Sequence, residues 1–105
     1  MIEQTLTLPC GHTLPNRLGK AAMTEGLADA HDRATPAHQR LYQTWARGGA
    51  ALLLTGNLMI DRRYLERAGN VVLEDESGLA PLRDWARTVR DSGSQLWAQI
   101  SHPGR

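Results

Sequence analysis

Three stretches of the chain end in side chains that could hydrogen-bond a small planar ligand. Thr24 closes the first stretch, Thr55–Asn57 closes the second, and Gln99, Ser101 and His102 lie at the end of the third. Together these residues offer hydroxyl groups, amides, exposed backbone and one imidazole. Such groups suit the edge of a planar heteroaromatic ring, which proteins recognise with a small number of well-placed polar groups.

Other chemistries lack support in the sequence. The four histidines show no ligand spacing and no Cys–His cluster exists, so no metal site is expected. Neither a phosphate-binding loop, a dinucleotide fingerprint after a strand, nor a nucleophile elbow is present. Each strand-end residue also has an ordinary interpretation, because Thr24 and Thr55 can bond local backbone, Gln99 can be a satisfied barrel amide, and His102 can be a loop residue. Their convergence at one end of a sheet is what favours a binding site.

The elements that would position these groups alternate along the chain. The short apolar run Ala50–Gly56, bounded by glycines, reads as a strand buried on both faces. Helical patterns flank it at Thr35–Arg47 and Leu79–Asp91, and further strands are predicted at Leu18–Thr24 and Gln95–Ser101. The order strand, helix, strand, helix, strand predicts a parallel sheet with its helices on one face, and the carboxyl ends of its strands at one end.

Two other segments are predicted less completely. Thr5–Leu8 and His12–Leu14 flank the turn signal Pro-Cys-Gly and predict an N-terminal hairpin, with an ordered tail as the alternative. The long connection Asn57–Leu73 suggests a lid over the carboxyl end of the sheet, or else a solvated excursion, and its last residues, from Val71, form a short extended piece.

Composition limits the class of protein. The chain has 105 residues, 41% hydrophobic and 22% charged, with a formal net charge of +1. These values fit one small globular domain, with neither nucleic acid nor an anionic membrane as a partner. The lone Cys10 and the absence of a signal-peptide pattern at the start make the cytoplasm the expected location. Because three strands leave open edges and an uncovered face, the fold is expected to continue past Arg105 or to be completed by another chain, such as a second copy.

Two strings resemble a known family. The segment 16–24 reads NRLGKAAMT and is similar to the N-R-x(4)-(A/P)-M-(T/C) opening of the old yellow enzyme family of flavin reductases. The segment 99–105 reads QISHPGR and resembles that family's Q-L-x-H-x-G-R string on the third barrel strand. Between them, residues 48–56 match its second strand.

The resemblance implies a fold and a cofactor. It implies the first three β/α units of a (β/α)8 TIM barrel, incomplete in this chain. Residues 1–17 would form an N-terminal cap, and residues 18–105 three strands with two helices. Members hold FMN at the carboxyl ends of the strands and pass hydride from NADH or NADPH, through the flavin, to an activated alkene or related small-molecule acceptor.

The resemblance also implies cofactor-binding residues. Backbone around Ala22 and Met23 would line the isoalloxazine ring, and the Thr24 hydroxyl would lie near its reactive edge. Gly56 would let its strand approach the ring closely, and the Gln99 amide would bind the pyrimidine edge. His102 and Arg105 match the motif as further candidates.

The sequence departs from the family pattern in a few respects. Ala22 replaces the commoner proline, and Thr24 lies where some members carry a redox-tuning cysteine. The family's catalytic and phosphate-binding groups lie on later strands and have no counterpart here. The isolated chain is therefore expected to have little or no reductase activity.

Two alternatives to the flavin enzyme remain open. One is a small self-associating α/β domain that works by binding or assembly without catalysis. The other is an open, doubly wound sheet of flavodoxin type, ranked last because the loop Glu25–Arg33 lacks the glycine-rich or hydroxyl-rich character of a phosphate site.

Overall fold

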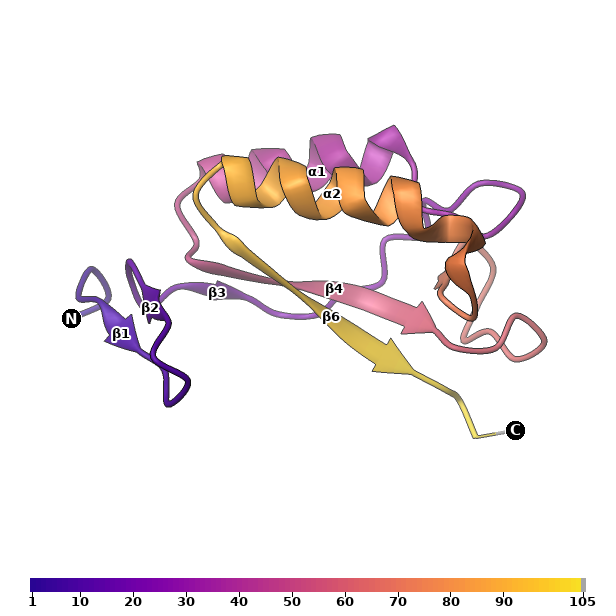
Figure 1. Cartoon of the computed structure of the whole chain (residues 1–105), viewed down its shortest axis with the longest axis horizontal. Coiled ribbons are helices and arrows are strands. Elements are labelled where there is room, and N and C mark those ends of the chain that lie inside the picture. The colour runs from indigo at the N-terminus through magenta and orange to yellow at the C-terminus, as the bar shows by residue number, and fades with distance from the viewer. Residues whose placement is uncertain (105) are drawn as a thin grey trace.

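The computed structural model describes residues 1–104, which form an α/β structure (Figure 1). A two-stranded antiparallel hairpin comes first, and a four-stranded parallel sheet with two helices on one face follows. In chain order the elements are β1 (Leu6–Thr7), β2 (Thr13–Leu14), β3 (Gly19–Lys20), α1 (Pro36–Arg47), β4 (Leu52–Met59), β5 (Val71–Val72), the 3-10 turn η1 (Glu76–Gly78), α2 (Leu79–Asp91) and β6 (Gln95–Ser101).

Strand β4 is the centre of the parallel sheet. β3 pairs with its beginning, β5 pairs with its end, and β6 pairs along its length. Because all three pairings are parallel, the carboxyl ends of the strands lie at the same end of the sheet. The other edge of β6 has no partner strand within residues 1–104.

The first strand of this sheet is shorter than the sequence pattern predicts. The prediction of a strand over Leu18–Thr24 is wrong in length, since β3 covers only Gly19–Lys20 and residues 21–29 have no regular secondary structure. The physical reason is an irregularity in β4. Its pairing with β6 jumps from Leu54 to Asn57, and the Gly56 amide there donates to the Glu25 side chain at 3.0 Å instead of to a backbone carbonyl.

The two helices begin and end where their sequence signals predict. In α1, Thr35 is the N-cap residue, its N–H donates to Nδ1 of His38 at 3.0 Å, and Pro36 occupies the first helical position. Before α2, the Asp75 carboxylate accepts from the Ser77 amide at 2.9 Å, which satisfies an N–H group at the start of the turn η1. The predicted bounds of α2 are confirmed.

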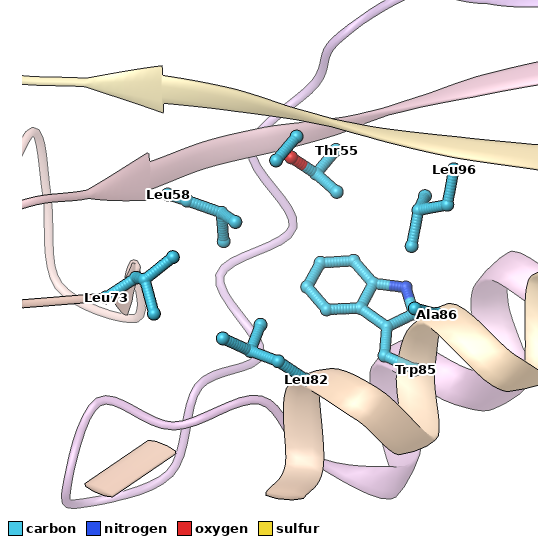
Figure 2. A pocket seen from close by; sticks show the side chains of 8 residues that line it. Thr55, Leu58, Leu73, Leu82, Trp85, Ala86 and Leu96 are labelled. Carbon is cyan, nitrogen blue, oxygen red and sulfur yellow. The ribbon is translucent and has the colours of Figure 1, made fainter. Parts of the chain in front are cut away.

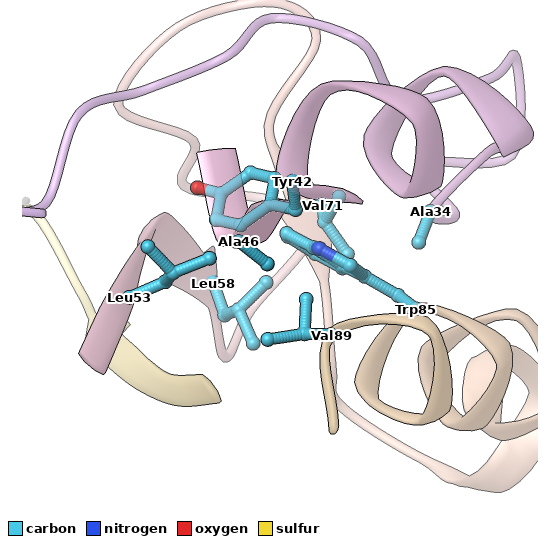
Figure 3. Packing of buried hydrophobic residues seen from close by; sticks show 8 residues of the cluster. All are labelled: Ala34, Tyr42, Ala46, Leu53, Leu58, Val71, Trp85 and Val89. Atoms are coloured by element: carbon cyan, nitrogen blue, oxygen red, sulfur yellow. The ribbon is translucent and has the colours of Figure 1, made fainter. Parts of the chain in front are cut away.

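The helices cover one face of the sheet with an apolar core (Figure 3). Trp85 and Tyr42 are at its centre, with ring centroids 5.0 Å apart in an edge-to-face arrangement. The His38 ring also packs against Trp85, with ring centroids 4.6 Å apart. The buried residues of this core cluster are Ala34, Tyr42, Ala46, Leu53, Leu58, Val71, Trp85 and Val89.

The predicted hairpin is present at the amino-terminal end of the sheet. Its Leu14 is buried, and Nδ2 of Asn16 donates to the carbonyl of Gly49 at 2.7 Å, next to the start of β4. The opposite end of the sheet is thus left for the strand-end residues. In residues 1–104 no helix is long and apolar enough to cross a membrane.

Candidate functional site

Thr24, Asn57 and Gln99 belong to one hydrogen-bonded network at the carboxyl ends of the strands. The Thr24 hydroxyl donates to Oε1 of Glu66 at 2.9 Å, and Nδ2 of Asn57 donates to the same oxygen at 3.2 Å. Nε2 of Gln99 donates to Oδ1 of Asn57 at 2.6 Å. The structure therefore brings together the strand-end groups that the sequence pattern places at one end of the sheet.

Glu66 joins the network from the long loop that follows β4. Hydrogen bonding from Thr24 lowers the pKa of Glu66, burial opposes this, and the bond from Asn57 lowers it further. The side chain is therefore an ionised carboxylate at neutral pH, and accepts hydrogen bonds without donating any. It holds both the Thr24 proton and an Asn57 proton toward itself.

The long loop contacts the strand ends, as a lid would. The Arg67 guanidinium donates to the carbonyl of Thr24 at 3.2 Å and lies 3.6 Å from Oε2 of Glu66. Farther on, the backbone of Gly69 runs against that of Gly26 so closely that a Cβ at Gly69 would lie 2.9 Å from it. Most of residues 61–69 are nevertheless exposed, so the loop both contacts the strand ends and is largely solvated, and the lid stays a prediction.

A β-bulge in β4 lies directly beside the network. Thr55 and Gly56 together oppose the single residue Ala98 of β6, so the ladder is interrupted. Side chains then accept the hydrogen bonds of two nearby amides. Oγ1 of Thr55 accepts from the Gln99 amide at 3.0 Å, and Oε2 of Glu25 accepts from the Gly56 amide at 3.0 Å.

Gly56 is in contact with the segment that carries Thr24. A Cβ at Gly56 would lie 2.5 Å from the carbonyl oxygen of Met23, 2.6 Å from Cα of Thr24 and 2.7 Å from Oε1 of Glu25. Real side chains do not tolerate such distances to backbone, so glycine here permits a close approach of two chain segments. The sequence-based reason for this glycine, close approach to a ligand ring, stays a prediction.

The other candidate residues lie around this network. Ala22 is partly buried, Met23 is 52% exposed, and both precede Thr24 in the irregular segment. His102 is exposed, its Nδ1 accepts from the Gly104 amide at 2.9 Å, and its ring lies 5.5 Å from that of Tyr64. It therefore lies at the end of β6 but makes no hydrogen bond to the network. Arg105 lies outside the described residues.

A second polar group lies beneath the network, toward α1. The hydroxyl of the buried Tyr42 donates to Oε2 of Glu25 and lies 3.3 Å from Nζ of Lys20, whose ammonium stands over the rings of Tyr42 and Trp45. Burial, reinforced by the Glu25 carboxylate, raises the pKa of Tyr42 far above its usual range. Burial also lowers the pKa of Lys20. Tyr42 is therefore a donor to Glu25 at any physiological pH.

These groups fit part of a flavin and do not suggest a metal. Amide and hydroxyl groups of Gln99, Asn57 and Thr24 match the donors and acceptors along the edge of a planar ring. The basic side chain in the network, Arg67, is already paired with Glu66, so a phosphate would need other groups. Among residues 1–104 no three His, Cys, Asp or Glu side chains gather as metal ligands would.

An apolar cavity of about 200 Å³ lies elsewhere, between the sheet and α2 (Figure 2). Leu82 and Trp85 of α2 face Leu96 of β6 across it, and Leu58 and Thr55 of β4 complete the wall. Because its lining is almost entirely aliphatic and aromatic, it offers little to the polar edge of a flavin. The candidate site is therefore the network at the strand ends.

Sequence reasoning placed Asn57 among the strand-end groups without giving it a cofactor role, and it missed Glu25 and Glu66. Asparagine, threonine and glutamine side chains both donate and accept hydrogen bonds, so their presence at the strand ends did not indicate a carboxylate partner. Nothing in the spacing shows that the acceptor is Glu66, because the loop brings it back across nine residues to Asn57.

No family model matches the chain. Curated relatives do. It is 39% identical over 104 residues to the NADH-dependent flavin oxidoreductase iliE of Hypocrea jecorina, covering 95% of this chain and 26% of that protein. It is 33% identical over 108 residues to the NADH-dependent flavin oxidoreductase iccE of Talaromyces variabilis, covering 99% of this chain and 26% of that protein. The chain thus spans about a quarter of the length of these relatives.

Solved structures agree on the fold. The old yellow enzyme homologue from Zymomonas mobilis superposes with a TM-score of 0.87 at 21% identity, over 99% of this chain and 28% of that one. Morphinone reductase in complex with tetrahydroNAD superposes with a TM-score of 0.87 at 20% identity, over 99% and 28%.

The fold and the strand-end network define the first β/α units of a (β/α)8 barrel, open in the described residues. The sequence is similar to NADH-dependent flavin oxidoreductases over about a quarter of their length, and the fold matches the corresponding part of an old yellow enzyme homologue. The resemblance that the two strings suggest is confirmed.

Proposed function

We propose that this chain forms one side of an FMN site in an oxidoreductase that passes hydride from NADH or NADPH, through the flavin, to an activated alkene or a related acceptor. The observation that carries the proposal is the network that joins Thr24, Asn57 and Gln99 at the strand ends. The similarity to proteins described as NADH-dependent flavin oxidoreductases supports it.

The redox chemistry is supplied by the flavin when it is bound, and the protein supplies orientation and hydrogen bonds. The bond from Nε2 of Gln99 to Asn57 fixes the orientation of the Gln99 amide, which would bind the pyrimidine edge. Because the Thr24 proton points to Glu66, the Thr24 oxygen presents its lone pairs to a ligand and suits a ring N–H. Backbone at Ala22 and Met23 would line the ring, held in place by the contact with Gly56.

The isolated chain is expected to show little or no reductase activity. It offers groups for one side of a ring, and Arg67, the cation within the network, is engaged by Glu66. NADH oxidation by the purified chain, with FMN added, is expected to stay at the rate of free FMN. A rate well above that background would contradict this part of the proposal.

A chimera tests the flavin site itself. The matched segment of the Hypocrea jecorina relative is replaced by this chain, and flavin content and NADH oxidation are measured. We expect a yellow, active protein in which Gln99→Ala weakens flavin binding about three- to tenfold, as loss of a hydrogen bond does. Thr13→Val, which removes an exposed hairpin hydroxyl, is the matched control and should leave binding unchanged. A folded chimera without flavin would refute the proposal.

A second candidate function is self-association without catalysis. The unpaired edge of β6 and the 45% exposed Trp97 favour it, since an open strand edge beside apolar surface promotes pairing between copies. Sedimentation of the purified chain distinguishes the two. A colourless, stable oligomer that ignores FMN supports self-association, whereas a monomer whose strand-end residues respond to FMN supports the flavin site.

A further inference from the structure

The segment that carries Thr24 is held in place without a strand ladder. β3 ends at Lys20, and the next nine residues have no regular secondary structure. A hydroxyl that recognises one atom of a ligand must nevertheless be fixed within a fraction of an ångström. Something other than sheet hydrogen bonding must therefore hold Thr24 at the strand end.

The loop contributes the bonds of Thr24 to Glu66 and Arg67, and Glu25, the residue after Thr24, attaches the segment to β4 and α1. Its Oε2 accepts from the Gly56 amide at 3.0 Å and from the Tyr42 hydroxyl. Tyr42 is fully buried in the helix-side core, so one of the two donors is fixed by the packing around it. Charge-assisted hydrogen bonds of this kind are stronger than neutral ones and restrict geometry more.

Glu25 and Gly56 both help to hold the Thr24 segment against the bulge of β4. The bulge frees the Gly56 amide from the β4–β6 ladder, and the missing side chain at Gly56 leaves room for the backbone of Met23 and Thr24. The Thr55 hydroxyl, from the same bulge, accepts from the Gln99 amide. Two side-chain acceptors thus connect the site to the bulge. Glu25 attaches the Thr24 segment to Gly56, and Thr55 attaches Gln99.

We infer that Glu25 is a positioning residue: its carboxylate, bonded to the Gly56 amide and the Tyr42 hydroxyl, holds the Thr24 hydroxyl in place beside Asn57 and Gln99. The relevance of that position to a flavin rests on the proposed function. The positioning itself depends only on contacts within this chain.

The test compares the 105-residue chain with Glu25→Ala and Glu25→Gln by amide NMR. The glutamine carbonyl accepts both hydrogen bonds without the charge, so E25Q is expected to keep Gly56 exchange within a few-fold of the parent chain. E25A is expected to speed exchange of the Gly56 amide by about tenfold or more and to shift the Thr24 resonances. The Gln95 amide, bonded to Ala51 at 2.9 Å at the other end of the sheet, is the internal reference.

A matched carboxylate control is Glu74→Ala. Glu74 accepts from Arg62 in the loop after β4, so its loss should leave Gly56 and Thr24 unchanged. If E25A does not fold, Tyr42→Phe removes one donor to Glu25 and keeps the ring in the core. It is then expected to shift Thr24 and to raise Gly56 exchange by a smaller factor.

The results separate this inference from the proposed function. Thr24 and Gly56 unmoved in E25A, or in Y42F if E25A is unfolded, would overturn the inference whatever the flavin result. Movement in E25A with recovery in E25Q supports it. In the chimera, E25A should also shift the flavin absorption band and E25Q should restore it. A chimera that binds no flavin even with Glu25 present would refute the proposed function and leave positioning to be decided by the NMR result.

Discussion

Two tryptophans on opposite faces of the sheet differ in their exposure to solvent. Trp85 of α2 is 1% exposed and packs against the rings of Tyr42 and His38, whereas Trp97 of β6 is 45% exposed. Neighbours of Trp97 in β6, Leu96 and Ala98, line the wall facing α2, so Trp97 itself points to the uncovered side. The helix-covered face is closely packed around Trp85, although Ile100 at the end of β6 is 54% exposed on the same side, and the opposite face leaves Trp97 half exposed.

The strand ends differ from both faces because polar groups dominate there. Thr24, Asn57, Glu66 and Gln99 satisfy one another, and the network is exposed. Stability is therefore expected to come from the helix side, and ligand recognition from the strand ends. The following substitutions test that division.

The largest effect is expected from the tryptophan pair. Trp85→Ala removes the centre of the core and should lower the free energy of unfolding by about 3–5 kcal/mol. Trp97→Ala should cost less, about 1–2 kcal/mol, because only part of the side chain is buried. Urea unfolding followed by far-UV circular dichroism gives both values. Equal losses would show that the two faces are buried alike in solution.

A glycine pair tests the close approach at the bulge. Gly56→Ala must displace the backbone of Met23 and Thr24, at an expected cost of about 1–3 kcal/mol. Gly19→Ala, whose Cβ would have its nearest contact at 3.8 Å from a carbonyl oxygen of Leu52, should be tolerated. Urea midpoints measure the difference. A harmless Gly56→Ala would show that segment 23–25 does not lie against β4.

His38 gives the helix side a pH dependence. Burial lowers the pKa of His38 below its ordinary 6.5, outweighing the nearby Glu25 carboxylate and the Thr35 amide. The unfolded chain then binds a proton more readily than the folded one, so stability is complete above about pH 6.5 and falls as the pH drops toward the lower folded pKa.

Urea midpoints measured above and below pH 6.5 check this expectation. His38→Gln should reduce the fall across that range, whereas His102→Gln, at an exposed position, should retain it. A fall of the same size in the His38→Gln variant would place its origin at another group.

Local sequence signals predicted most of the elements. The Thr-Pro start of α1, the bounds of α2 and of β6, and the N-terminal hairpin all follow from caps, turn residues and periodicity that act over a few residues. β4 begins two residues later than predicted and runs on to Met59. The strand predicted over Leu18–Thr24 is mostly irregular because its partner has a bulge, which a period of two in one segment cannot reveal.

The candidate site was predictable in part, from the topology of the sheet. Parallel strands must bring Thr24 and Gln99 to one end of the sheet, so their convergence follows from the topology. Glu25 and Glu66 become part of the site through contacts between segments distant in the sequence. Glu25 accepts from the Gly56 amide, and Glu66 is brought to Thr24 by the loop after β4. The cofactor roles of the candidate residues, the cytoplasmic location and the absence of nucleic-acid and membrane partners stay predictions.

The most direct measurement is a titration of the ¹⁵N-labelled chain with FMN. If the strand ends form one side of a flavin site, amides at Thr24, Gly56 and Gln99 should shift together and saturably, while those around Trp85 and Val89 stay fixed. Shifts confined to the helix side, or no response at the three strand-end amides up to the solubility limit of FMN, would contradict the account.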